Sequence, residues 1–380
     1  MRCTELVAAA ALVLTLSGCG GGGSSSPSGL PPANTSIPVP PPVQSADDSA
    51  FAVSVWVQAP GALRPDDIVQ LGNSIFVVYQ DNNNNPDGTN VPGTSPQSKV
   101  IEYDLSGNVL QTFNVPGHPD GIAVFNTTTV WVSTNEDANP EIIVIDTTSN
   151  TTQVYTSDVA TLPHGGGLDD MKVINGVVYA SASNPTTTSS PNPNLAPYST
   201  DGNGSTAQFG VNTGPIVYSI TLNSDGKTFH STPVLMSSTP ATLLPGNTPA
   251  TLNATDADSS AIAPNGDLMI DSQQDSALIF ISNLGAANQA VSVLPMTLYG
   301  NPWPLDDTRW SPASGLSFML VSDNKGQLVY RIDAPGGFAP NTAFSSGQGT
   351  VLQSNTTTGV MTPIFVGMNS PHGMWFITPP

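Results

Sequence analysis

This 380-residue sequence has few cysteines, few charges and very little positive charge. Its only cysteines are Cys3 and Cys19, near the N-terminus, so we expect no intramolecular disulfide in the folded domain. Charged residues make up 9%, and 8 Lys and Arg stand against 28 Asp and Glu, which gives a net charge of −20. Such a chain repels a nucleic-acid backbone and favours cations or neutral ligands. Acidity of this kind also serves simply to keep an exported protein soluble.

Helical periodicity and several catalytic motifs are missing as well. There is no Gly-x-Ser-x-Gly elbow, phosphate-binding glycine loop or cysteine-based site, which argues against serine-triad acyl transfer and nucleotide chemistry. Residues 81–88, DNNNNPDG, look like a calcium loop, but the glycine is misplaced and the twelfth position carries no acid. We therefore expect a turn-rich hairpin extension there.

What the sequence does contain is a repeated short turn, acidic or histidine-bearing, that opens into an apolar strand. Most of these turns precede a strand, a tight turn and a second strand, as in residues 67–79 and 121–133. The spacing is near fifty residues, which is typical of a solenoid or propeller. The turns lie at 64–67, 118–121, 163–165, 256–258, 305–307 and 371–373.

The repeat predicts an all-β fold, a single β-propeller most simply built of six four-stranded blades, with five or seven as alternatives. Strand 51–57 precedes the first repeat and strand 373–377 follows the last, so we expect both to pair in one blade and close the ring. Residues 184–214 are rich in Pro, Ser, Thr and Asn, which predicts a long surface loop.

Residues 107–124, GNVLQTFNVPGHPDGIAV, resemble the broad NHL, SMP-30 and YncE-like β-propeller group. The resemblance extends over roughly residues 50 to 380 and is architectural. Lactonases, lyases, sugar-acid hydrolases and binding scaffolds all occur in this group, so the resemblance implies a fold and leaves the activity open.

The N-terminus resembles a bacterial lipoprotein signal. A short apolar stretch ends in Leu16-Ser17-Gly18-Cys19, which is similar to a lipobox, and this implies cleavage before Cys19 and acylation of that residue. We divide the chain into a signal peptide (1–18), a lipidated cysteine with a Gly, Ser and Pro-rich tether (19–46) and the propeller (47–380). Gly20 is similar to the residue found in lipoproteins sent to the outer membrane, where we expect a periplasmic or surface-exposed protein.

In a propeller, the turns that enter the innermost strands lie together around the central channel. Nine carboxylates would then crowd its mouth, and a divalent cation such as Ca²⁺ would relieve their repulsion. The alternative is that these aspartates only cap backbone N–H groups in their turns. The nine are Asp66, Asp67, Asp120, Asp169, Asp170, Asp256, Asp258, Asp306 and Asp307.

Three of the four histidines, His118, His164 and His372, fall in the same turns, and three His around one open position is a zinc arrangement. The alternative is that each fills a turn, and the offset of His118 by one residue predicts that it splays away from the other two. The predicted metal ligands are Asp66, Asp120, His118, His164, Asp170, Asp258, Asp307 and His372.

Tyr299, Trp303 and Trp310 form an aromatic cluster that either binds a ligand such as a sugar or a cation, or seals a gap between blades.

For the whole protein we hypothesise a monomeric, lipid-anchored propeller that binds a cation, a small molecule or an envelope partner. The alternatives are a metal-dependent hydrolase or lyase and an envelope assembly scaffold; the sequence leaves open whether it is an enzyme.

Overall fold

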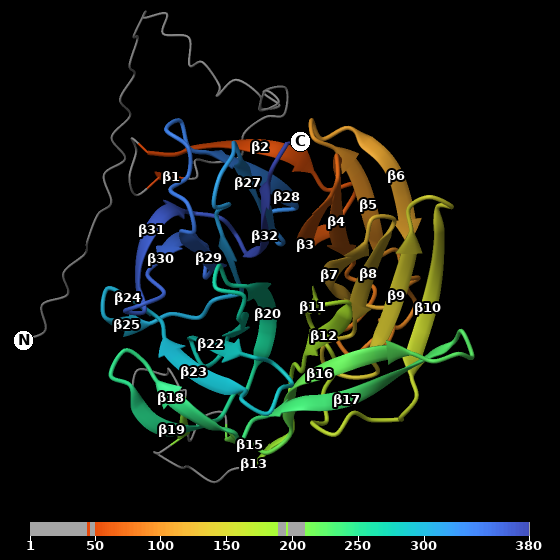
Figure 1. Ribbon diagram of the computed structural model, residues 1–380. Coiled ribbons are helices and arrows are strands. Elements are labelled where there is room, and N and C mark those ends of the chain that lie inside the picture. The colour runs from red at the N-terminus through yellow and green to blue at the C-terminus, as the bar shows by residue number, and fades with distance from the viewer. Residues whose placement is uncertain (1–43, 46–49, 189–194, 197–209, 380) are drawn as a thin grey trace, which may run out of the picture.

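The computed structural model describes residues 44–45, 50–188, 195–196 and 210–379, and this part of the chain is all-β (Figure 1). None of these residues lies in a helix, so the described part offers no helix that could cross a membrane. The predicted signal peptide and most of the predicted tether lie outside the described residues. So does much of the predicted loop 184–214, whose described ends pair as β13 (Thr187–Thr188) and β15 (Val211–Asn212).

Two of the sheets have four strands each. One runs in the order β3 (Arg64–Leu71), β4 (Ser74–Gln80), β5 (Lys99–Asp104) and β6 (Val109–Asn114). The other runs in the order β2 (Ala52–Gln58), β28 (Leu328–Asp333), β27 (Phe318–Asp323) and β32 (Pro371–Ile377). The strand nearest the N-terminus of the domain and the last strand therefore share one sheet, as the sequence predicted.

An eight-stranded sheet consists of two antiparallel sets of four, which are joined where β10 and β17 pair in parallel. The first set is β7 (Pro119–Asn126), β8 (Thr129–Thr134), β9 (Glu141–Asp146) and β10 (Thr151–Ser157). The second is β11 (Met171–Ile174), β12 (Val177–Ser181), β16 (Pro215–Leu222) and β17 (Thr228–Met236).

Two seven-stranded sheets extend the same pattern with short additional strands. One contains β20 (Ala257–Ile262), β21 (Leu268–Ser272), β22 (Ala277–Ser282) and β23 (Ala290–Pro295), followed by β18 (Pro240–Leu243), β19 (Thr248–Leu252) and β14 (Leu195–Ala196). The other contains β26 (Asp307–Trp310), β29 (Ala343–Gly347), β30 (Thr350–Ser354) and β31 (Val360–Val366), with β24 (Thr297–Leu298), β25 (Asn301–Pro302) and β1 (Gln44–Ser45).

The innermost strands form a closed ring, which gives the chain a propeller-like arrangement (Figure 1). Each of β3, β7, β11, β20, β26 and β32 contacts the next one in this order, and β32 contacts β3. Because all of these strands enter the ring from the same side, the turns that precede them meet at one end of the central axis.

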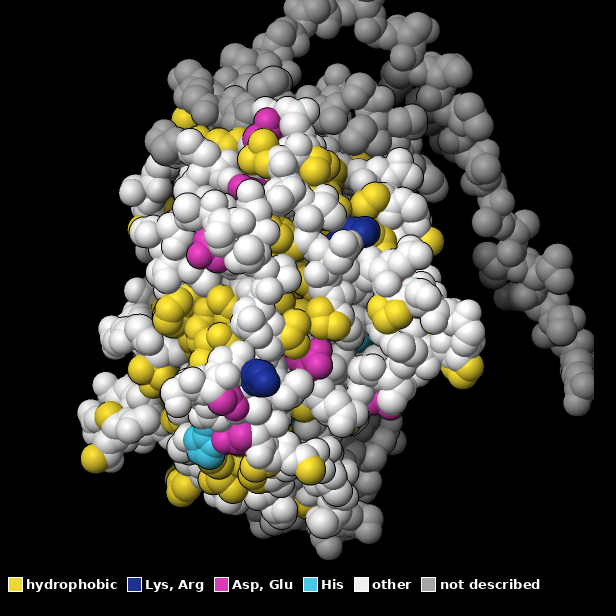
Figure 2. All heavy atoms as spheres, turned by 90° about the vertical axis from the view of Figure 1, so that its right-hand side faces the viewer, with side chains coloured by type: hydrophobic (Ala, Val, Ile, Leu, Met, Phe, Trp, Pro, Cys, Tyr) yellow, Lys and Arg dark blue, Asp and Glu magenta, His cyan; other side chains and the backbone are white. Residues whose placement is uncertain are grey.

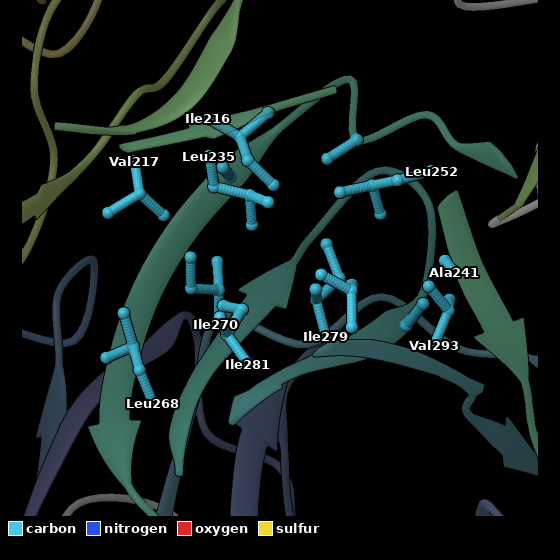
Figure 3. Packing of buried hydrophobic residues seen from close by; sticks show 14 residues of the cluster. Ile216, Val217, Leu235, Ala241, Leu252, Leu268, Ile270, Ile279, Ile281 and Val293 are labelled. Atoms are coloured by element: carbon cyan, nitrogen blue, oxygen red, sulfur yellow. The ribbon is translucent and has the colours of Figure 1, made fainter. Parts of the chain in front are cut away.

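Both faces of the sheets are buried, because each sheet packs between two neighbours. Along β21, Leu268 and Ile270 point toward β16 and β17, where they meet Ile216, Val217 and Leu235 (Figure 3). Met269, between them, packs on the other face with residues of the next sheet. This alternation follows from the two-residue period of a strand. It explains why the strands that follow the innermost ones, such as β4 and β27, are mostly apolar.

Tight turns connect neighbouring strands. Asn175 and Gly176, between β11 and β12, have φ values of 52° and 79°, the positive angles of a type I′ hairpin turn. The predicted hairpin extension of residues 81–88 lies between β4 and β5 and is bridged by Asn84 and Asn90. On the side shown in Figure 2, charged side chains are sparse and most of the surface is neither charged nor hydrophobic.

Candidate functional site

The acidic turns owe their orientation to a bulge at the start of the inner strands. In β3, Asp66 and Asp67 lie between the paired residues Pro65 and Ile68, and only one residue of β4 stands opposite them. The same two-against-one step occurs in the sheets that contain β7, β20 and β32. A bulge re-aims side chains out of the regular pleat. The first bulge residue is Asp66 in β3, Asp120 in β7, Asp258 in β20 and His372 in β32.

The first bulge residues line a cavity of about 290 Å³ on the axis. Nine carboxyl side chains and two histidines line it, and no Lys or Arg is among its described lining residues. Seven of the nine aspartates predicted for the channel mouth are present, and Asp170 and Asp307 are not. The carboxyl side chains belong to Asp66, Asp67, Asp120, Glu136, Asp137, Asp169, Asp256, Asp258 and Asp306.

Sequence reasoning missed the polar residues that follow the second strands. Gln80 ends β4, and Glu136 and Gln273 follow β8 and β21. The end of each of these strands pairs with the start of an inner strand, so its polar residue reaches the same face. This pairing could have been predicted from the sequence, because the repeat already indicates a second strand that pairs with the inner one.

The two histidines of the cavity form ion pairs. The Nδ1 atom of His118 lies 3.0 Å from Oδ1 of Asp120, and Nδ1 of His372 lies 2.8 Å from Oδ1 of Asp66. Burial alone would lower the pKa of His118, but Asp120 and other acids raise it to about 9. Burial is likewise outweighed at His372, whose pKa rises to about 10 because Asp306 and Asp66 face it.

The pKa values of several carboxyl groups are raised as well, and here burial is the cause rather than the opposing effect. Burial, reinforced by neighbouring acids, raises the pKa of Glu136, Asp169 and Asp258 well above the usual range. Burial is also the largest cause at Asp306, and brings its pKa to about 7. At Asp120 the effect of burial is partly offset by His118, and the pKa rises to about 6. The raised pKa values reflect a cavity in which nine carboxyl groups face two histidines, with no Lys or Arg among the described lining residues.

Two groups of side chains bring one ligand atom each to within 4.8 Å of one another, as a bound metal ion requires. The first is His118, Asp120 and Glu136, and the second is Glu136, Asp169 and Asp258. Oδ1 of Asp120 accepts a hydrogen bond from Gln80, whereas its Oδ2 atom has no hydrogen-bond partner in the described part of the chain, although only 4% of the residue is exposed. Such an oxygen is costly to bury unless a ligand meets it.

A second layer of aspartates surrounds one arginine, and of this layer only Asp67 also lines the cavity. Asp67, Asp170 and Asp307 all surround the guanidinium of Arg309, with N–O separations of 3.4, 3.7 and 2.6 Å. Lys172 also pairs with Asp170. Asp170 and Asp307 are thus placed beside the cations Arg309 and Lys172 rather than in the cavity predicted for them.

This layer also connects neighbouring sheets through the backbone. Oδ2 of Asp67 accepts from the N–H of Ile122, 3.2 Å away, and Oδ2 of Asp307 accepts from Met374, 2.7 Å away. Asp170 makes the equivalent bond to Ser260, at 2.8 Å. Each of these carboxylates therefore caps an inner strand of the next sheet, so the capping alternative holds for this layer.

His164 does not join the other two histidines. Its Nδ1 atom lies 2.9 Å from the hydroxyl of Tyr218, and its Nε2 atom lies within 3.0 Å of the carbonyls of Gly167 and Ser183. Burial lowers its pKa to about 4, so it is a neutral, fully bonded turn residue. The expected splaying of His118 was wrong, because His118 and His372 line the cavity and His164 turns away from it.

The predicted aromatic residues do not form a binding cluster at the cavity, although Trp303 and Trp310 pack against the same hydrophobic cluster. Tyr299 is 80% exposed in the turn between β24 and β25, Trp303 packs against a hydrophobic cluster, and Trp310 meets Phe280 edge to face. None of the three lines the acidic cavity. For Trp303 and Trp310, this placement matches the alternative in which the rings seal the packing between sheets.

No protein-family model matches this chain, and no curated protein is similar to it in sequence. Among solved structures, a streptogramin B lyase is 12% identical with a TM-score of 0.42, and the alignment covers 86% of this chain and 94% of that one. A putative gluconolactonase is 10% identical with a TM-score of 0.41, over 86% and 100% of the two chains. A protein from Lactobacillus plantarum is 12% identical with a TM-score of 0.43, over 82% and 88%. These likenesses concern the fold alone.

Proposed function

We propose that this protein is a lipid-anchored, extracytoplasmic six-bladed β-propeller that binds a divalent cation in its acidic axial cavity. Six inner strands form the ring, and the parallel contact of β10 with β17 joins two four-stranded blades into the eight-stranded sheet. The observation that carries the function is the unpartnered Oδ2 of Asp120 inside a cavity lined by nine carboxyl groups.

A cation explains the charges of the cavity better than capping does. The capping aspartates contact Arg309, and Asp67 is the one of them that also lines the cavity, whereas the ion pairs described for the other carboxylates of the cavity are with His118 and His372. Repulsion between buried like charges is relieved when a dication binds several of their oxygens. The imidazole of His118 suits Zn²⁺ and similar ions, and the all-oxygen group with Asp169 and Asp258 suits Ca²⁺.

The export and anchoring part of the proposal rests on the sequence. The lipobox-like residues 16–19 and the tether that follows are expected to hold the propeller at the outer membrane, by a lipid on Cys19. We expect a monomer, and this expectation is supported by a ring whose strands β2 and β32 already belong to one sheet. An envelope protein or a small molecule would then reach the cavity from its open end.

Isothermal titration of the full-length protein, stripped of metal and held in detergent, tests the cation directly. We expect Ca²⁺, Zn²⁺ or Mn²⁺ to bind stoichiometrically, and Asp120→Asn to weaken binding at least tenfold. Asp158→Asn is the matched control, because Asp158 forms a similar pair with His230, at 2.9 Å, on the exposed surface. Equal affinity in both variants would place the cation elsewhere, and no binding of any of the three ions would refute the proposal.

A metal-dependent hydrolase or lyase is the second candidate function, and one observation favours it. A polar hollow of about 500 Å³ adjoins the cavity and shares Gln273, Asp306 and His372 with it, which leaves room for a small molecule beside an ion. An activity screen with lactones and cyclic esters, with and without the bound metal, would test this. Turnover that disappears with the metal and in Asp120→Asn would establish an enzyme. If the protein is instead an envelope assembly scaffold, we expect neither metal binding nor turnover.

A further inference from the structure

We infer that the cavity holds two divalent cations and that the carboxylate of Glu136 is shared between them. This inference rests on the cation-binding function proposed above and adds its stoichiometry and its bridging residue. The two groups of potential ligands overlap in one side chain only. Glu136 stands with His118 and Asp120 on one side, and with Asp169 and Asp258 on the other.

The first position already has the spacing of a metal site. The Nδ1 of His118 and the Oδ1 of Asp120 are 3.0 Å apart, which is the separation of two neighbouring ligands on an ion with bonds of about 2.1 Å. The remaining oxygen of Asp120 is buried and has no partner in the described part of the chain. This oxygen can therefore act as a metal ligand beside Glu136.

The second position is made of oxygen atoms alone. The carboxyl groups of Asp169 and Asp258 are hydrogen-bonded to each other, so a proton lies between them where an ion would bind. Asp169 lies at the end of the β10–β11 connection and Asp258 belongs to β20, so an ion at this position would also link two blades. Ca²⁺, Mg²⁺ and Mn²⁺ prefer such oxygen ligands.

A shared carboxylate fits both positions because its two oxygens can each bind one ion. Two-metal sites in proteins hold their ions about 3.5–4 Å apart. Glu136 lies in the loop after β8, lines the cavity and belongs to both ligand groups. Mn²⁺ accepts nitrogen and oxygen ligands, so one ion can report on both positions.

Mn²⁺ titration of the full-length, metal-free protein, followed by electron paramagnetic resonance and by metal analysis, tests this inference. We expect two equivalents and a spectrum broadened by coupling between the ions. Asp258→Asn and Asp120→Asn should each keep about one equivalent with an uncoupled six-line spectrum. Glu136→Gln should abolish the coupling and weaken both sites at least tenfold. Glu141→Gln, the same change on β9 outside the cavity, should keep two coupled ions.

The outcomes separate the two proposals. One equivalent in the wild type, or two equivalents without coupling, would overturn the shared Glu136 while the cation-binding function stands. The same would follow if Glu136→Gln retained the coupled spectrum. Failure of Mn²⁺, Ca²⁺ and Zn²⁺ to bind at all would overturn both. Circular dichroism of each variant distinguishes loss of an ion from loss of the fold.

Discussion

The Nη1 atom of Arg309 lies 2.6 Å from Oδ1 of Asp307, in a layer where both side chains are almost fully buried. Asp67 and Asp170 lie against the same guanidinium from two other sheets. Arg309 also donates to the carbonyls of Met374 and Ser260. One side chain therefore joins inner strands from several blades around the axis.

We predict that Arg309→Met lowers the free energy of unfolding by about 3–5 kcal/mol at pH 8, because it leaves buried carboxylates without their cation. The loss should be smaller at pH 5.5. Burial has already raised the pKa of Asp307 to about 8 and that of Asp67 to about 6, so both take up protons readily once the arginine is gone. Urea denaturation at the two pH values measures this, and an equal loss at both would contradict it.

Two glycines of the repeated turns are explained by close approach between blades. A Cβ atom on Gly121 would come within 2.4 Å of Cα of Asp170, and one on Gly373 within 2.6 Å of Cα of Asp67. Both glycines occupy the second bulge position, where the neighbouring blade presents an aspartate. The alternation of Asp and a small residue at this position is thus a packing requirement.

We expect Gly373→Ala to destabilise the protein by about 1–3 kcal/mol, because backbone atoms rather than a flexible side chain must move. Gly336→Ala is the matched control, since nothing lies within 4 Å of its added Cβ. That substitution should stay within about 0.5 kcal/mol of the wild type. Thermal unfolding compares the two, and equal midpoints would show that the inner strands can separate without cost.

The metal-free protein should be more stable at pH 6.5 than at pH 8.5. Asp306 has a pKa raised to about 7, and the pKa of His118 is raised to about 9. A group whose pKa is higher in the folded state adds stability below its unfolded pKa, and this stability is lost as the pH rises through the folded value. Each pKa unit crossed corresponds to about 1.4 kcal/mol. The pKa of His164 is lowered instead of raised. This lowering changes the stability only below the unfolded pKa of about 6.5, which is outside the pH range of this comparison.

Urea denaturation in the presence of a chelator measures this dependence. Addition of Ca²⁺ or Mn²⁺ at pH 8.5 should restore the lost stability in the wild type and only part of it in Asp120→Asn, which loses one of the two ligand groups. A metal-free protein that becomes more stable toward pH 8.5 would show that the carboxyl groups of the cavity do not repel one another as the geometry implies.

The repeat in the sequence was enough to predict the strands and the meeting of the acidic turns. Asp66, Asp120 and Asp258 could be placed because equivalent turns of a propeller share one end of the axis. The different partners of Asp66, which pairs with His372, and Asp67, which pairs with Arg309, could not be predicted, since they depend on a bulge that the residue types alone do not indicate. The departure of His164 depends on Tyr218, 54 residues later, which supplies the hydrogen bond that holds it. Such a partner is visible only once the strands are assembled.

The lipid anchor is the last prediction, and the two cysteines provide their own control. Cys19→Ser should move the protein from the membrane fraction to the soluble fraction, because serine cannot receive the lipid at the lipobox position. Cys3→Ser should remain in the membrane fraction, because residue 3 is expected to leave with the signal peptide. Cell fractionation, with mass spectrometry of the mature N-terminal peptide, measures both. Membrane retention of Cys19→Ser, or an unacylated N-terminus in the wild type, would show that another feature directs the protein to the membrane.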